Sequence, residues 1–305
     1  MKLRFGSDKS EQPGASVLDV AAGLELRDVG MTYGAGPEAR EVVARCSFRA
    51  ERGRFTVMIG PSGAGKSTLI RLIAGFERPT SGAITLDGRP ITKPGPDRQV
   101  VFQETALFPW MTTLDNVHYG PSARGELTSV NRARADQLLD KVGLSAFRAR
   151  YPAHLSGGMK RRAELARALI NDPAIMILDE PFRGLDAMTK RLMLEYYARL
   201  SADAGRTNFF VTTDVDEAIF LADRLLVMTH IPTRVRAVID VDLPRPRRFA
   251  DLAGDDRANQ IKMTVLSLLH EEVMKSFTSG SRAATDFIDA YRRRLGPTVD
   301  NRLSK

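Results

Sequence analysis

The segment from Gly60 to Ser67 places the strongest constraint on what this 305-residue chain can fold into. It reads Gly-Pro-Ser-Gly-Ala-Gly-Lys-Ser, and it stands between a predicted strand over residues 54–59 and a predicted helix over 66–74. Glycines let the backbone wrap closely around phosphate groups, and the amides at a helix N-terminus attract anionic oxygens. The pattern G-x-x-x-x-G-K-[ST] in this context therefore predicts a loop that binds a nucleoside polyphosphate.

The residues of this loop have distinct expected roles. We expect Lys66 to reach the β- and γ-phosphates and the Ser67 hydroxyl to bind Mg²⁺. The other candidates for nucleotide contact are the rest of the loop and the residue after it: Gly60, Pro61, Ser62, Gly63, Ala64, Gly65 and Thr68. A chance match of a glycine-rich turn is the alternative, and the flanking strand and helix argue against it.

Two carboxylates follow an apolar strand predicted over residues 175–178. Asp179 and Glu180 stand at the tip of this strand, where the chain turns, so Glu180 can face the terminal phosphate. We expect Asp179 to hold Mg²⁺ beside Ser67, and Glu180 to orient or deprotonate the attacking water. A pair of helix-capping acids is the alternative, since both residues suit a helix start.

Strand and helix patterns alternate along most of the chain, which predicts a mainly parallel sheet with helices on both faces. The interval over about 104–170 is helical, with expected breaks at Gly120-Pro121, Gly143 and Pro152, and we interpret it as an inserted subdomain. The other expected strands cover 24–29, 42–48, 83–86, 100–102, 208–212 and 225–228, and the other expected helices cover 187–200 and 215–221.

The character of the sequence changes after Pro244. We expect a linker over residues 245–248, a helix over 259–277 and a second short helix over 283–295. The expected domain organisation is thus a flexible leader over 1–22, a main domain over 23–245 and a helical extension over 246–305. The extension is either a helix docked on the main body or a regulatory, partner-binding segment.

Composition excludes several classes of protein. A single cysteine, Cys46, excludes an internal disulfide and a multi-thiolate metal site. No uncharged apolar stretch reaches 18 residues, so we expect a soluble, cytoplasmic chain without a membrane-spanning helix. The net charge of +8 suits nucleic acid or an anionic membrane, but the basic residues are scattered, as on solvated faces. The densest basic clusters are 160–162, 245–248 and 292–294.

Five motifs in order resemble those of the ATP-binding cassette (ABC) family. Residues 155–159, Leu-Ser-Gly-Gly-Met, precede the acidic strand by about 20 residues and are similar to the signature motif of that family. Gln103 looks like its glutamine loop, residues 181–186 look like its aspartate loop ending at Asp186, and Tyr33 stands where the family has an adenine-stacking aromatic residue. The resemblance runs from about residue 24 to 245, most of the chain.

This resemblance implies a fold and a set of ligands. The fold is the α/β P-loop NTPase fold of an ABC nucleotide-binding domain, with a mixed sheet, an antiparallel β part, the inserted helical subdomain and a short C-terminal helical extension. The implied activity is ATP hydrolysis, and the implied cofactors are ATP and Mg²⁺. Residues 108–112, 114–117, 214–222 and 239–246 also resemble ATPase subunits of nitrate/sulfonate/taurine-type importers.

The resemblance also implies partners and a mechanism. Two cassettes, alike or different, would dimerise head to tail, with Ser156, Gly157 and Gly158 of one subunit gripping the γ-phosphate on the loop of the other. Gln103 would sense that phosphate and the metal, next to a transmembrane permease subunit, on the cytoplasmic face of the cell membrane. A periplasmic or extracellular solute-binding protein would deliver the solute, and no nucleic acid would take part.

Thr213 departs from the family pattern, which has a histidine at this position. Threonine is shorter, carries no positive charge and offers one hydroxyl donor to the γ-phosphate. We expect hydrolysis that is slow or dependent on a partner, while ATP binding and dimer closure survive. The alternatives are a tolerated substitution, a regulatory cassette paired with an intact one, and a nucleic-acid-linked ABC ATPase, which the single phosphate loop and the lack of a long heptad run argue against. Arg161, Glu164 and Arg183 are milder departures.

Overall fold

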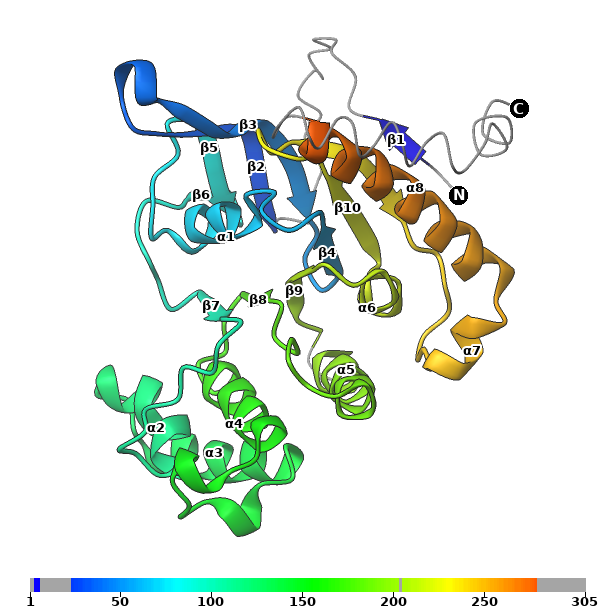
Figure 1. Ribbon diagram of the computed structural model, residues 1–305. Helices are drawn as coiled ribbons and strands as arrows, with labels where there is room; N and C mark the ends of the chain where they lie inside the picture. The colour runs from blue at the N-terminus through cyan, green and yellow to red at the C-terminus, as the bar shows by residue number, and fades with distance from the viewer. Residues whose placement is uncertain (1–2, 6–22, 203–204, 279–305) are drawn as a thin grey trace.

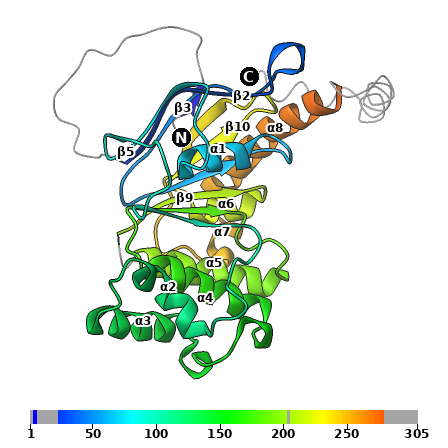
Figure 2. The ribbon, with the colours of Figure 1, turned by 90° about the vertical axis from the view of Figure 1, so that its left-hand side faces the viewer.

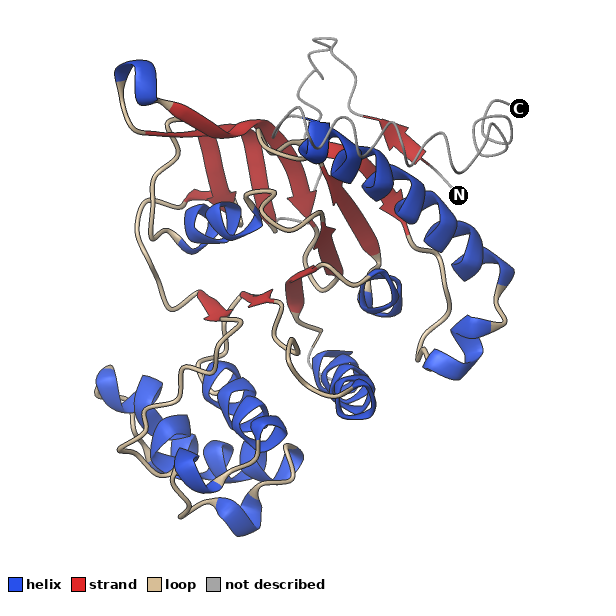
Figure 3. Cartoon of the chain, viewed as in Figure 1, coloured by secondary structure: helices blue, strands red, loops and turns tan. Residues whose placement is uncertain are grey.

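Two β-sheets and the helices packed on them form the body of the protein, and a group of helices extends from one end (Figures 1 and 3). This arrangement is a computed structural model, which describes residues 3–5, 23–202 and 205–278. The expected mixed sheet, antiparallel part and inserted helical subdomain are confirmed.

The larger sheet has seven strands in the order β1-β11-β10-β4-β9-β8-β7. The five strands from β10 to β7 are parallel, and β11 and β1 are added antiparallel at one edge. The bounds are β1 Leu3–Phe5, β4 Phe55–Ile59, β7 Arg98–Val101, β8 Ile175–Asp179, β9 Thr207–Thr212, β10 Arg224–Met228 and β11 Val235–Asp240.

The register of three central strands positions the site. Val211 of β9 lies opposite Met58 of β4 on one side and opposite Asp179 of β8 on the other. Because parallel strands end at the same edge of a sheet, the turns that begin at Gly60, Glu180 and Thr213 leave it at a similar level.

The smaller sheet is antiparallel, in the order β3-β2-β5-β6. Its strands are β2 Leu24–Tyr33, β3 Arg40–Ala50, β5 Ser81–Leu86 and β6 Arg89–Pro90. Strands β2 and β3 run several residues beyond the predicted ends because shifts in register between Leu26 and Thr32 let the two strands stay paired along their length.

Side chains of the central strands alternate between two apolar clusters. Met58 packs in the cluster that contains helix α1 (Lys66–Ala74) and the small sheet. Val57 and Ile59 pack in the cluster that contains helices α5 (Ala187–Ala202), α6 (Val215–Leu221) and the helical subdomain. The sheet is therefore buried on both faces, as its continuous apolar strands predict.

The helical subdomain lies at one end of the molecule (Figure 2). Its helices are α2 Thr113–Ala123, α3 Ser129–Lys141 and α4 Gly157–Leu169. Thr112, Thr128 and Ser156 cap their N-termini, each with its hydroxyl accepting from a backbone N–H. The predicted break at Gly120-Pro121 is wrong, because Pro121 falls in the last turn of α2, two residues before its final residue.

The ends of the described chain depart from the expected leader and tail. Leu3–Phe5, inside the expected leader, pairs as β1 with β11. Helices α7 (Phe249–Ala253) and α8 (Asp256–Thr278) follow the main domain, and Glu272 of α8 accepts from the His230 N–H at 3.0 Å. The second tail helix expected over 283–295 lies outside the described residues, and the domain boundaries stay predictions.

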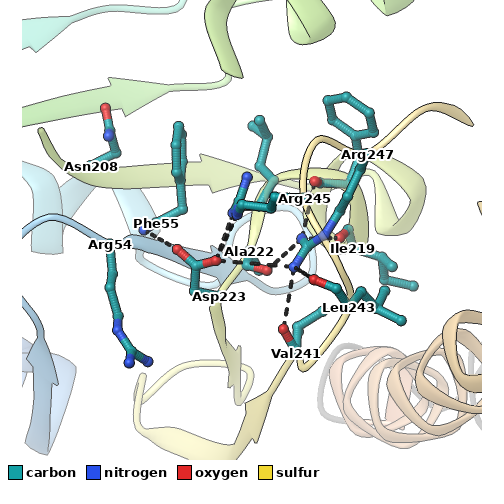
Figure 4. A network of polar contacts seen from close by, with 12 residues as sticks. Arg54, Phe55, Asn208, Ile219, Ala222, Asp223, Val241, Leu243, Arg245 and Arg247 are labelled. Atoms are coloured by element: carbon teal, nitrogen blue, oxygen red, sulfur yellow. Dashed lines mark hydrogen bonds and ion pairs between the residues drawn. The ribbon is translucent and has the colours of Figure 1, made fainter. Parts of the chain in front are cut away.

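Arg247 is buried at the junction between the main body and the tail (Figure 4). Its guanidinium donates to five backbone carbonyls: Ile219, Phe220, Ala222, Val241 and Leu243, at 2.6–3.2 Å. Burial, followed by the charge of Arg245, lowers the pKa of Arg247 to about 10, so the group stays charged at neutral pH. The expected solvated linker over 245–248 is wrong at this residue, since its side chain binds the segment to α6 and to the residues that follow β11.

We predict that Arg247→Ala lowers the free energy of unfolding by about 3 kcal/mol, because several carbonyls lose their donor in a buried place. The neighbouring Arg248→Ala is the matched control, since Arg248 is exposed, and should change stability by less than about 0.5 kcal/mol. Urea unfolding of both variants measures the difference. Equal effects of the two substitutions would contradict this account of the junction.

Candidate functional site

The phosphate loop leaves β4 and enters α1 as predicted. Gly63 and Gly65 have φ values of +76° and +78°, a region that glycine reaches without strain. A Cβ on Gly65 would also collide with the hydroxyl of Thr233, which donates to the Ala64 carbonyl. Thr233 therefore fixes the loop from behind and requires glycine at this turn.

Lys66 is buried inside the curve of its own loop. Its Nζ donates to the carbonyls of Gly60 at 2.9 Å and Pro61 at 2.8 Å. Burial lowers the pKa of Lys66, and the nearby carboxylates of Glu180 and Asp179 act in the opposite direction. An ammonium held this way is poised to exchange carbonyl partners for phosphate oxygens, which carry more negative charge.

Ser67 and Asp179 face each other from α1 and the end of β8. The Ser67 hydroxyl donates to Asp179 Oδ2 at 3.5 Å. Burial and the charge of Glu180 raise the pKa of Asp179, while Lys66 and Ser67 oppose them. A hydroxyl and a carboxylate oxygen are ligands that Mg²⁺ prefers, and a carboxylate with a raised pKa is one that a cation would stabilise. The residues therefore fit a magnesium ion shared with phosphate.

Glu180 occupies a strained backbone position. Its φ is +41°, which is uncommon for a residue with a side chain, and its N–H donates to the Val211 carbonyl at 2.9 Å. Strain of this kind costs about 1–3 kcal/mol and persists where the surroundings impose it, often at functional sites. The turn keeps the Glu180 carboxylate at the strand edge, with only 11% of its side chain exposed.

Arg183 connects the two candidate catalytic side chains that come from distant segments. Its Nη1 donates to Glu180 Oε2 at 3.2 Å and to Gln103 Oε1 at 3.4 Å. Gln103 is exposed and follows β7 by two residues. The structure thus relates Gln103 to Glu180 through an arginine whose role the sequence analysis did not predict.

A buried ion pair on α4 holds the segment around Gln103. Arg161 pairs with Glu164, and the side chains are only 5% and 3% exposed. Arg161 also donates to the carbonyls of Phe102 and Gln103, and Glu164 accepts from the Ala106 N–H at 3.0 Å. Arg161 and Glu164, which both depart from the family pattern, therefore form one interacting pair. The interpretation of residues 160–162 as a solvated basic cluster is wrong at Arg161.

Thr213 is exposed in the turn that precedes α6. Asp214 caps this helix by accepting from the backbone N–H groups of Asp216 and Glu217. Lys190 of α5 pairs with Asp214 at 2.9 Å and with the buried Glu217 at 3.1 Å. The segment after β9 is thus held by an ion-pair network, and Thr213 projects from a fixed turn.

A cavity of about 370 Å³ brings together part of the phosphate loop, Glu180 and Thr213. We call it the phosphate-side cavity. It is lined by Gly60, Pro61, Ser62, Glu180, Arg183, Lys190, Thr212, Thr213, Asp214, Glu217, Leu269 and Val273. The last two residues come from α8, so the tail helix borders the cavity, which no sequence motif indicated.

The signature residues lie apart from the phosphate loop, in a second cavity of about 720 Å³. We call it the signature-side cavity. It is lined by Ser156, Gly157 and Gly158 together with Asp186, whose carboxylate accepts from the Thr189 N–H at 3.0 Å. Within the described residues, one chain therefore does not bring its signature residues to its own phosphate loop.

Tyr33 lies at the end of β2, where its hydroxyl donates to Glu77. Burial and Glu77 raise the pKa of Tyr33, and a hydrogen bond with Thr68 opposes them. Tyr33 and Thr68 are therefore close to each other beside the start of α1. A role of either residue in nucleotide binding stays a prediction.

The fold and the phosphate loop together define a P-loop NTPase, and comparison with known proteins identifies its family. A family model described as ABC transporter matches residues 43–183. The nitrate import ATP-binding protein NrtD of Synechococcus elongatus is 41% identical over 250 residues, which are 81% of this chain and 91% of that protein. An ABC transporter ATP-binding protein of Methanocaldococcus jannaschii is 41% identical over 226 residues, 73% of this chain and 82% of that protein.

Solved structures agree with this result. A dimeric ATP-binding cassette bound to ADP and phosphate in a post-hydrolysis state superposes with a TM-score of 0.63 and 28% sequence identity, covering 72% of this chain and all of the other. The chain belongs to the ABC transporter ATP-binding family, and it is an ATP-binding ATPase. In the described part of the chain no helix combines the length and apolar character needed to cross a bilayer.

We predict that Arg161→Gln or Glu164→Ala alone destabilises the protein by about 3–5 kcal/mol, since each leaves a buried partner without compensation. The double variant should cost at least about 1 kcal/mol less than the sum of the two, because it removes both charges together. Urea unfolding of the four proteins gives the coupling. Additive effects would mean that the two residues do not act as a unit.

Proposed function

We propose that this chain is the energy-coupling ATPase subunit of an ABC importer for a small solute of the nitrate, sulfonate or taurine type. The observation that carries this proposal is the phosphate-side cavity, where Gly60, Ser62, Glu180 and Thr213 converge with Lys66 and Asp179 beside them. The similarity to a nitrate import ATP-binding protein supports the direction of transport and the class of solute.

The phosphate loop binds the nucleotide. Backbone N–H groups at the start of α1 and the Lys66 ammonium bind the β- and γ-phosphate oxygens. Ser67, Asp179 and Gln103 are the residues that would hold Mg²⁺, which neutralises phosphate charge when it is bound. Tyr33 stacks on the adenine, and Thr68 supports the loop from the first turn of α1.

Glu180 acts as the general base in hydrolysis. The oxygen of a water molecule attacks the γ-phosphorus, while the bond from that phosphorus to the β–γ bridging oxygen breaks and its electron pair leaves with ADP. The proton of the water passes to the Glu180 carboxylate. The positive φ of Glu180 supports this role because it fixes the carboxylate at the edge where β4 and β9 also end.

The complete site forms between two subunits. The phosphate loop and the signature residues line separate cavities of one chain, and a head-to-tail dimer would bring them together with a nucleotide between them. Met188 and Leu192, near Asp186, are 67% and 63% exposed, as expected of residues that a second subunit covers. The dimeric state of the related cassette supports this arrangement.

Other partners follow from the proposed role. A transmembrane permease subunit binds the surface next to Gln103, and a periplasmic or extracellular solute-binding protein delivers the solute to it. The chain works at the cytoplasmic face of the membrane. Closure of the ATPase dimer on ATP and its opening after hydrolysis move the permease.

Thr213 supports a second candidate function, a regulatory cassette that binds ATP and pairs with an intact partner. A threonine hydroxyl replaces the histidine donor of the family pattern, and the loss of one donor to a charged transition state costs about 10²–10³ in rate. Steady-state turnover of the purified chain separates the two functions. Turnover supports the importer ATPase, and ATP binding without turnover supports the regulatory cassette.

We predict that Glu180→Gln lowers kcat for Mg-ATP hydrolysis by about 10²–10⁴-fold, because the amide cannot accept the proton of the water. ATP affinity should stay within about threefold of the wild type, since the amide keeps the shape of the side chain. The control is Glu38→Gln, at an exposed glutamate outside both cavities. Unchanged turnover of Glu180→Gln would remove Glu180 from the mechanism.

We predict that two inactive variants restore activity to each other when they are mixed. Lys66→Ala disables the phosphate loop, and Gly157→Asp places a carboxylate where the signature turn meets phosphate. A Cβ at Gly157 comes no closer than 3.8 Å to Leu185, so this variant is expected to fold. In a head-to-tail heterodimer one site keeps both wild-type halves, and ATPase activity returns. A mixture as inactive as its components would contradict a composite site.

A further inference from the structure

Arg183 is a cationic side chain that lines the phosphate-side cavity. In the described part of the chain, the carboxylate it pairs with is that of Glu180, the proposed general base. Its polar side-chain contacts in the described part of the chain are Glu180 Oε2 and Gln103 Oε1, at 3.2 and 3.4 Å. The side chain is 60% exposed, so solvent or a ligand can reach it. Its charge is therefore accessible in the cavity that the phosphate loop also lines.

The backbone directs Arg183 toward that place. The turn after β8 closes with the Arg183 N–H donating to the Glu180 carbonyl at 3.1 Å. The next residue, Gly184, has a φ of +81° and lets the chain reverse immediately afterwards. Residues three apart in this turn thus bring the guanidinium and the Glu180 carboxylate to one side.

The other cations near the cavity have different tasks. Lys190 forms ion pairs with the carboxylates of Asp214 and Glu217, and these pairs hold the turn before α6. Lys66 lies within the loop and contacts the loop carbonyls. Arg183 is thus the cavity-lining cation that can move to a new anion without breaking a structural ion pair.

The same cavity contains Thr213 and no histidine. None of the four histidines of the chain lines the phosphate-side cavity. The Thr213 hydroxyl supplies one neutral donor, whereas hydrolysis builds negative charge on the phosphate oxygens and on the leaving oxygen. Besides Lys66 and the Mg²⁺ of the proposed site, Arg183 is therefore the cavity-lining cation that can supply the charge that the Thr213 hydroxyl lacks.

We propose that Arg183 is a catalytic residue of this ATPase, whose guanidinium binds the terminal phosphate in the transition state and replaces the histidine that Thr213 cannot mimic. This inference rests on the proposed function. Without a nucleotide, the guanidinium pairs with Glu180 and Gln103. When the γ-phosphate enters, two N–H groups of the planar guanidinium bind its oxygens, and Glu180 is freed to accept the proton of the water.

The bonds made and broken are those of hydrolysis itself. Water oxygen bonds to the γ-phosphorus, the bond to the bridging oxygen breaks toward ADP, and Glu180 takes the proton. Arg183 transfers no proton and contributes only hydrogen bonds and charge, so no further reactant is needed. Its contribution is largest in the transition state and small in ATP binding, which gives a distinctive kinetic signature.

Steady-state kinetics of the full chain with Mg-ATP test this proposal. Arg183→Ser should lower kcat by about 10²–10³-fold while KM for ATP changes by less than about threefold. Arg183→Lys should recover part of the loss, since it restores charge without the planar fork. The control is Arg132→Ser, at an exposed arginine of α3 outside both cavities, and it should behave as wild type.

Adding Thr213→His to the Arg183→Ser variant is the most discriminating experiment. It should raise kcat of Arg183→Ser by at least about tenfold, and by a larger factor than it raises kcat of the wild type, because the histidine and Arg183 would serve the same phosphate. If Arg183→Ser is as active as the wild type or more active, Arg183 is at most a brake on Glu180, and the proposal is wrong. A failure of Thr213→His to rescue Arg183→Ser contradicts it as well.

A second readout separates this proposal from the proposed function. ADP with fluoroaluminate imitates the transition state, and Arg183→Ser should weaken its trapping at least about tenfold while ATP affinity is kept. This measurement works even if the wild-type chain turns over slowly. If Glu180→Gln loses turnover but Arg183→Ser traps ADP and fluoroaluminate as well as the wild type, the proposed ATPase function stands and the catalytic role of Arg183 is wrong. Equal losses of trapping and ATP affinity would also overturn it.

Discussion

The hydrogen-bonded register of β4, β9 and β8 is the constraint on which the site depends. Val211 lies opposite Met58 on one side and Asp179 on the other, so the turns that follow the three strands leave the sheet at one level. A shift of one residue would move a turn by about 3.3 Å and reverse the faces of its strand. The apolar clusters on both faces of the sheet hold this register and thereby hold the phosphate loop, Glu180 and Thr213 together.

Much of this frame could be predicted from the sequence, because local signals and the fold agree. The predicted helices over 66–74 and 215–221 have the observed bounds, since a left-handed Gly75 ends α1 and Asp214 caps α6. The antiparallel strand β11 was not predicted because Arg236 interrupts its apolar pattern, and β1 has only three residues. β11 is fixed by pairing with β10, and β1 by pairing with β11, and a local sequence pattern does not reveal such pairing.

Some residues of the candidate site could also be predicted from the sequence, and others could not. The phosphate loop and the Asp179-Glu180 pair have sequence patterns because their chemistry requires contiguous residues. Arg161 and Arg247 looked like members of solvated basic clusters, but carbonyls from distant segments surround both. Burial of an arginine depends on tertiary partners, and neighbouring residues in the sequence do not reveal them. The same limit hid the contact of Arg183 with Gln103, 80 residues away in the chain.

A structure of the full chain trapped with ADP, Mg²⁺ and fluoroaluminate would show which side chains meet the transferred phosphate. We expect a head-to-tail dimer in which the fluoroaluminate contacts Lys66 and Arg183 of one subunit and the signature turn of the other, with Glu180 facing the attacking water. A nucleotide bound away from the edge of β4, β8 and β9 would contradict the assignment of the site. An Arg183 that still pairs with Glu180 in the trapped state would contradict its catalytic role.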